Sequence, residues 1–137
     1  MKAEKMTVPA EMKQVVPVAA MVNRIMAQLN CIQRSKMQIA VVIDEIFSNI
    51  VQYAYENQEG TVTVEAEAEE DPPCLVIRFI DQGMPFDPLA VRDPEMTGPA
   101  KKRSVGGLGL YIVKKTMDKV SYEYKNGSNI LVIRKYI

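Results

Sequence analysis

A glutamate and an asparagine four positions apart, Glu45 and Asn49, form the first pair that could support catalysis. Apolar residues recur around them at helical intervals, so we expect a helix from Ser35, its N-cap, to about Glu56. The two side chains would then project one turn apart at the margin of the apolar face. A carboxylate there can take a proton from a hydroxyl or water, and an amide oxygen can coordinate a hard cation. The alternative is a helix that simply carries two polar residues at its edge.

A second candidate is Asp81, at the end of the predicted strand 75–81. Alternate residues of that strand are apolar, and Asp81 continues their face. A buried acid is costly unless a donor satisfies it, and the exocyclic amino group of adenine in an apolar slot would be such a donor. Gly83 would then let the backbone approach the base closely. The alternative is a strand-ending turn, in which Asp, Gly and Pro are common.

A glycine-rich turn, Gly106 to Gly109, begins the predicted helix 107–118. Exposed N–H groups at a helix start, together with the helix dipole, suit phosphate oxygens. A basic triplet stands just upstream: Lys101, Lys102 and Arg103. These side chains could neutralise phosphates or the charge that develops during phosphoryl transfer. Taken separately, each feature also fits an ordinary turn and a solvated basic loop.

The elements that must position these motifs follow from the same patterns. A short apolar segment at 6–8 predicts an edge strand, and helical spacing predicts a helix over 11–29. Strict alternation over 61–69 predicts a strand with one solvated face. The segment 82–106 is expected to be a loop, and Asn126-Gly127 predicts a tight turn between strands 120–124 and 130–134. The fold class expected is an α/β (α+β) two-layer sandwich: one mixed, mostly antiparallel sheet with helices on a single face.

Composition restricts the chemistry and the partners. The 137 residues are expected to form a single domain, 1–137, and contain 17 basic and 17 acidic residues but no histidine. Balanced charge argues against nucleic acid or an anionic membrane as the main partner. The absence of histidine leaves carboxylates, hydroxyls, amides and lysines for any catalysis. Cys31 and Cys74 are expected to be reduced, in a cytoplasmic protein without a signal peptide or a membrane span.

Together and in this order, the three motifs resemble the N, G1 and G2 boxes of the GHKL ATPase superfamily, whose nucleotide-binding core is called the Bergerat fold. The N box is similar to Asp44–Asn49 and the G1 box to Asp81–Pro88. The G2 box is similar to Gly107–Leu110 with the residues that follow it, Tyr111-Ile112-Val113 and Met117-Asp118. The forms of the G1 and G2 boxes are similar to those of the anti-sigma factor serine/threonine-protein kinases. The resemblance covers nearly the whole chain.

The resemblance implies a role for each matching residue. Glu45 would be the base that deprotonates the attacking hydroxyl, and Asn49 would bind the Mg²⁺ that bridges the phosphates of ATP. Asp81 would recognise adenine. The other nucleotide contacts implied are Gly83, Phe86, Gly107, Leu108 and Gly109, with one of Lys101, Lys102 and Arg103 at the terminal phosphate. The segment 82–106 would form a lid.

The function implied is that of a Mg-ATP-dependent serine kinase that phosphorylates a STAS-type anti-anti-sigma protein, binds a sigma factor, and forms a homodimer. One departure is Tyr53, at a position where family members often carry histidine. An alternative is a non-catalytic switch, in which nucleotide only sets the shape of a partner-binding surface. An ATPase module of a larger machine is a third possibility.

Overall fold

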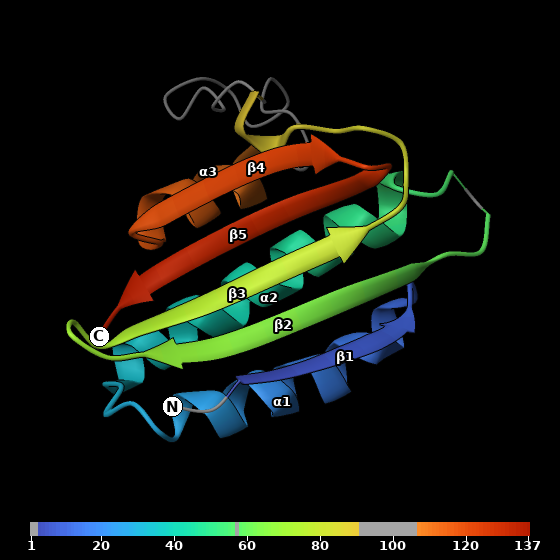
Figure 1. The fold of residues 1–137 in the computed structure, drawn as a ribbon. Coiled ribbons are helices and arrows are strands. Elements are labelled where there is room, and N and C mark those ends of the chain that lie inside the picture. The colour runs from blue at the N-terminus through green and yellow to red at the C-terminus, as the bar shows by residue number, and fades with distance from the viewer. Residues whose placement is uncertain (1–2, 57, 91–106) are drawn as a thin grey trace.

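The computed structural model describes residues 3–56, 58–90 and 107–137. Within them, five strands form one sheet in the order β1-β2-β3-β5-β4, and every neighbouring pair is antiparallel. The strands are β1 (Ala3–Pro9), β2 (Thr61–Glu69), β3 (Cys74–Asp81), β4 (Lys119–Lys125) and β5 (Ser128–Tyr136). β3 occupies the centre, and β1 and β4 form the edges (Figure 1). The expected sheet is confirmed, but over the described residues it is antiparallel throughout rather than mixed.

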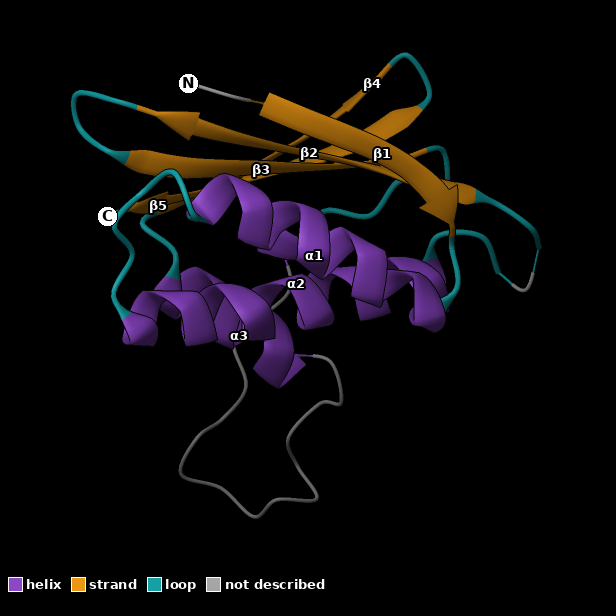
Figure 2. Ribbon diagram, turned by 90° about the horizontal axis from the view of Figure 1, so that it is seen from below, coloured by secondary structure: helices purple, strands orange, loops and turns teal. Residues whose placement is uncertain are grey.

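Helices cover one face of this sheet. Among the described residues they are α1 (Val15–Met26), α2 (Gln33–Tyr53) and α3 (Gly107–Thr116), with short 3₁₀ turns at Met12–Gln14 and Pro88–Ala90. Figure 2 shows the sheet as one layer and the helices as the other, so the expected two-layer sandwich is confirmed. In the described part of the chain, no helix is both long and apolar enough to cross a bilayer.

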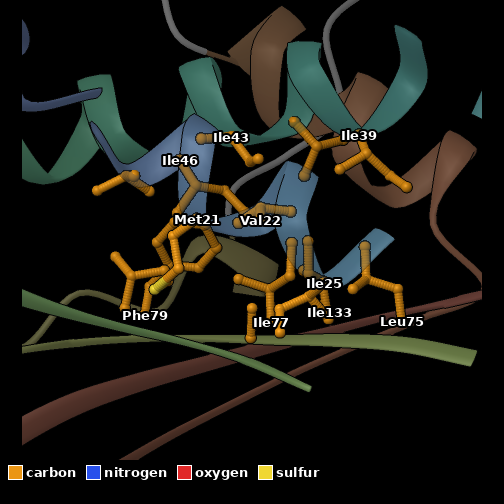
Figure 3. Close-up of a cluster of buried hydrophobic side chains, with 14 of the residues drawn as sticks. Met21, Val22, Ile25, Ile39, Ile43, Ile46, Leu75, Ile77, Phe79 and Ile133 are labelled. Carbon is orange, nitrogen blue, oxygen red and sulfur yellow. The ribbon is translucent and has the colours of Figure 1, made fainter. Parts of the chain in front are cut away.

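The core lies between the two layers. The apolar positions of β2 all face it, whereas the alternate positions of that strand are at least partly exposed. β3, the central strand, is buried along most of its length. Side chains of α1 and α2, such as Ile25 and Ile43, meet those of β3, such as Ile77 and Phe79 (Figure 3). Burying a side chain of this size contributes about 1.5–3 kcal/mol, so these contacts hold the helices on the sheet.

Two local predictions, the start of α2 and the turn between β4 and β5, can be compared with the structure. Ser35 is not the N-cap of α2: the helix begins two residues earlier, after Ile32, whose backbone is extended and whose side chain makes no cap. Ser35 lies buried inside the first turns because its position faces the interior. The turn between β4 and β5 is confirmed, since Asn126 and Gly127 have φ values of 52° and 79°, as a two-residue hairpin turn requires.

Candidate functional site

A largely apolar cavity lies between α2, the sheet and the loop that follows β3. The space between its atoms is about 480 Å³, part of it open to solvent. Its walls bring together segments far apart in sequence: Ile46, Asn49, Ile50, Tyr53 and Ala54 of α2 and its end; Phe79, Asp81, Met84, Phe86 and Pro88 of β3 and its loop; Leu110 of α3; and Tyr122, Asn129 and Leu131 of the β4–β5 hairpin. Two predicted polar residues, Asn49 and Asp81, therefore face one cavity.

Asp81 is the buried acid of this cavity, with only 4% of its surface exposed. It ends β3 on the same face as Phe79, as its place in the alternation predicts. Its Oδ1 atom accepts two hydrogen bonds, from the backbone N–H of Gly83 at 2.9 Å and from Nδ2 of Asn129 at 2.9 Å. None of the described residues donates to Oδ2. A buried carboxylate oxygen at a cavity wall needs a donor, so a ligand with an N–H group in this position would be favoured.

Gly83 is placed by the end of α2. A Cβ at this position would overlap the backbone and Cβ of Ala54, and the next N–H, that of Met84, donates to the Ala54 carbonyl at 2.9 Å. Tyr55 fastens the same loop, because its hydroxyl accepts from the N–H of Gln82 at 2.8 Å and donates to the Thr61 carbonyl at 2.6 Å. The loop that follows Asp81 is therefore fixed against the C-terminal end of α2. The contact that requires a glycine at position 83 in this structure is with Ala54.

Glu45 and Asn49 occupy the intermediate position that their sequence spacing predicts. Both are half-buried, and Nδ2 of Asn49 donates to the Glu45 carbonyl at 2.8 Å. This bond orients the amide and leaves its oxygen without a donor from any described residue. An amide oxygen can serve as one ligand of Mg²⁺, which usually takes one or two protein ligands together with phosphate oxygens and water. Asn49 therefore fits the expected metal-binding role.

Gly109 lies directly against Glu45. A Cβ on Gly109 would overlap the Glu45 carboxylate, so only a glycine lets the start of α3 approach this side chain so closely. The next residue, Leu110, lines the cavity. The N-terminus of a helix attracts anions, and α3 begins at Gly107. The base candidate and the predicted phosphate-binding turn are therefore neighbours.

The remaining predicted residues fall into three groups. Phe86 and Tyr53 line the cavity, whereas Leu108 is partly exposed and is not among the lining residues. Three basic candidates lie outside the described residues: Lys101, Lys102 and Arg103. Most of the expected lid, from residue 91 onward, lies outside them as well.

Asn129 and Tyr122 belong to the site but were not identified from the sequence. Asn129 is 6% exposed and bonds to Asp81, and Tyr122 donates its hydroxyl to Asn129 Oδ1. Burial raises the pKa of Tyr122, so its hydroxyl keeps its proton. The sequence did contain an indication of this role. Asn129 lies on the same face of β5 as Leu131 and Ile133, so it is a polar residue at a position that faces the core.

Comparison with known proteins gives consistent results. A model of the histidine kinase-like ATPase domain family matches residues 8–135. The serine-protein kinase RsbW of Listeria innocua serovar 6a is 35% identical over 106 residues, which cover 72% of this chain and 64% of that protein. RsbW of Halalkalibacterium halodurans is 29% identical over 137 residues, covering 97% of this chain and 82% of the relative.

A solved structure supports the fold. The crystal structure of the RsbU and RsbW domains of Rv1364c from Mycobacterium tuberculosis matches with a TM-score of 0.69 and 15% identity, over 99% of this chain and 32% of that one. The chain thus spans less than two thirds of the Listeria relative and about a third of the mycobacterial protein. Since the family model matches nearly all of the sequence, the chain belongs to the histidine kinase-like ATPase domain family.

Proposed function

We propose that this protein binds Mg-ATP in the cavity and transfers the γ-phosphoryl group to a serine of a partner protein. One observation supports this most strongly: three separate sequence motifs each contribute a lining residue to one apolar cavity, namely Asn49, Asp81 and Leu110. Glu45 lies one turn from Asn49 on α2 and against Gly109 at the start of α3. Adenine would fill the apolar part, with its amino group donating to Asp81 Oδ2. The phosphates would extend toward Asn49 and the first N–H groups of α3.

In the proposed reaction, the serine oxygen forms a bond to the γ-phosphorus, and the bond from that phosphorus to the β–γ bridging oxygen breaks, so that ADP leaves. The Glu45 carboxylate takes the serine proton. Asn49 would contribute a ligand to Mg²⁺, which when bound neutralises charge on the phosphate oxygens. The protein's own contribution is mainly to orient the nucleotide and to hold Glu45 beside the start of α3.

Serine as the acceptor is supported by the relatives, which are named serine-protein kinases. A STAS-type anti-anti-sigma protein as substrate, a sigma factor as a second partner, and a homodimer are further parts of the proposal, and they rest on the family resemblance alone. The lid residue that contacts the terminal phosphate is proposed to be one of Lys101, Lys102 and Arg103.

Thermal unfolding with Mg-ADP and Mg-GDP tests the binding step. A ligand at about 100 times its Kd stabilises a protein by roughly 2.7 kcal/mol, which should raise Tm by several degrees. We expect this shift with Mg-ADP only, and its loss in Asp81→Asn. Equal shifts with both nucleotides, or none with either, would contradict the assignment of the cavity.

The catalytic step is tested with Glu45→Gln, which keeps the size of the side chain but removes the base. We expect Mg-ADP binding to be unchanged and transfer from ATP to a STAS-type partner to fall about 100-fold or more. A variant that transfers phosphate at the wild-type rate would exclude Glu45 as the base. A wild-type protein that binds ADP and its partner but transfers no phosphate would support the non-catalytic switch instead.

A further inference from the structure

We infer that Asn129 is a positioning residue, which orients Asp81 so that one carboxylate oxygen, able only to accept hydrogen bonds, faces the purine ring of the nucleotide. In this way Asn129 makes the site select 6-aminopurine over 6-oxopurine nucleotides. This inference rests on the proposed nucleotide site. Asn129 is the register partner of Asp81 across β3 and β5. Its side chain therefore lies beside the carboxylate rather than across the cavity from it.

The amide nitrogen of Asn129 has three acceptors around it. Nδ2 lies 2.9 Å from Asp81 Oδ1, 2.9 Å from the Met84 carbonyl and 3.3 Å from the Gly83 carbonyl. The nitrogen thus ties the carboxylate and the loop that follows β3 to the same point. Oδ1 of Asp81 is already satisfied by this bond and by the Gly83 N–H, so that oxygen is not available to a ligand.

The amide oxygen of Asn129 has donors around it, which settles the orientation of the group. The Phe86 N–H donates to Oδ1 at 3.2 Å, and the Tyr122 hydroxyl donates to the same atom. A flipped amide would set its nitrogen against these donors and its oxygen against three acceptors, so the observed orientation is strongly preferred. Tyr122 in turn lies on β4, so the hairpin as a whole determines how Asp81 is presented.

The consequence is chemical selection at position 6 of the purine. Asp81 Oδ2 has no donor among the described residues and belongs to an acceptor-only group when ionised. The 6-amino group of adenine can donate to it, whereas the 6-oxo group of hypoxanthine or guanine would place an acceptor against an acceptor. Losing a charged hydrogen bond of this kind corresponds to about 10- to 150-fold in affinity. The selection depends on Asp81 keeping its orientation, and hence on Asn129.

ADP and IDP provide a sharp test, because the two nucleotides differ only in the base, where the 6-amino group is replaced by a 6-oxo group and N1 changes from an acceptor to an N–H donor. The measurement is the Kd of each by isothermal titration with Mg²⁺, for the full chain and its variants. We expect the wild type to prefer ADP by about 100-fold, and Asn129→Asp to reduce the preference to a few-fold. This isosteric change keeps the acceptor for Phe86 and Tyr122 but replaces the amide donor beside Asp81 with a second carboxyl group, which repels the Asp81 carboxylate or shares one proton with it. A merely structural role would change both Kd values together and leave their ratio unaltered.

Each of two test variants, Asn129→Asp and Tyr122→Phe, has a control variant with the same chemical change at an exposed position. Asn126→Asp makes the same chemical change in the exposed turn of the same hairpin, and should keep the full preference. Tyr122→Phe removes one donor to Asn129 and should lower the preference about 3- to 10-fold. Its control, Tyr124→Phe, removes a hydroxyl from an exposed residue of the same strand and should have no effect.

The outcomes separate the inference from the proposed function. A wild type that binds ADP no better than IDP overturns both. A wild type that prefers ADP, with the same preference in Asn129→Asp and Tyr122→Phe, overturns only the role of Asn129. Should Asn129→Asp not fold, as judged by circular dichroism, the conservative Tyr122→Phe variant decides: an unchanged ratio overturns the inference, and a lowered ratio supports it.

Discussion

Replacing Gly83 by alanine tests whether the loop after β3 is fixed by its contact with the end of α2. The new methyl group would overlap the carbonyl group and Cβ of Ala54. These are backbone atoms and the first side-chain atom, so no flexible side chain can move aside. The loop itself must shift, and the hydrogen bond from the Met84 N–H to the Ala54 carbonyl, 2.9 Å long, would then be lost.

The expected loss of stability is the sum of three effects. Overpacking costs about 1–3 kcal/mol, and a lost hydrogen bond costs about 0.5–1.5 kcal/mol. Alanine also reduces the conformational freedom of the unfolded chain, which offsets about 0.4–1 kcal/mol of this loss. We therefore expect Gly83→Ala to lower the free energy of unfolding by about 2 kcal/mol, and Tm by about 6–8 °C. Because Asp81 Oδ1 bonds to the Gly83 N–H, ADP affinity should fall as well.

Gly127→Ala is the matched control. Gly127 has a φ of 79°, and a Cβ there would meet nothing within 4 Å, so its only penalty is backbone strain of about 1–2 kcal/mol. Urea unfolding and ADP titration of the two variants should show lost affinity for Gly83→Ala only. A Gly83→Ala protein whose Tm stays within about 2 °C of wild type would refute the argument from packing against Ala54.

Three other perturbations follow from the contacts described. Gly109→Ala forces aside only the flexible end of Glu45, so Tm should change little while phosphoryl transfer falls about 100-fold; an unchanged transfer rate would contradict this. Tyr55→Phe leaves the Thr61 carbonyl and the Gln82 N–H without their partner, so the free energy of unfolding in urea should fall by about 1–2 kcal/mol. An unchanged free energy of unfolding would show that these two bonds do not stabilise the fold. Burial raises the pKa of the Cys74 thiol, so the folded state holds that proton more tightly than the unfolded state. The free energy of unfolding should therefore be constant below about pH 8.5 and fall as the pH rises from there toward the folded pKa. In Cys74→Ala this fall should be smaller.

The fold was largely predictable because its signals are local. The alternation in 61–69 and the Asn126-Gly127 turn each specify their own geometry, and both are confirmed. Ser35 misled the prediction of the start of α2 because residue type suggested a cap, whereas tertiary packing buries the side chain within the helix. Whether two strands run parallel or antiparallel depends on which strands are neighbours in the sheet, and no single segment encodes that order.

The candidate site was predictable only in part. Asp81, Asn49 and Glu45 stand out by type and spacing, and the structure brings their segments together. The approach of Gly109 to Glu45 and the bond from Asn129 to Asp81 join residues distant in sequence. Contacts of this kind depend on how the elements pack, which residue types and spacing in a single sequence do not specify.

The pairing of β3 with β5 also has a consequence for the kinetics of folding. Asp81 and Asn129 are 48 residues apart, and the cavity is complete only when the intervening segment has closed into a loop. Loop closure of this length is entropically costly, and long-range pairings tend to form late. β2 and β3 adjoin in the chain and can pair first. Nucleotide should therefore stabilise the protein mainly by slowing its unfolding, with little effect on the rate at which the sheet first forms.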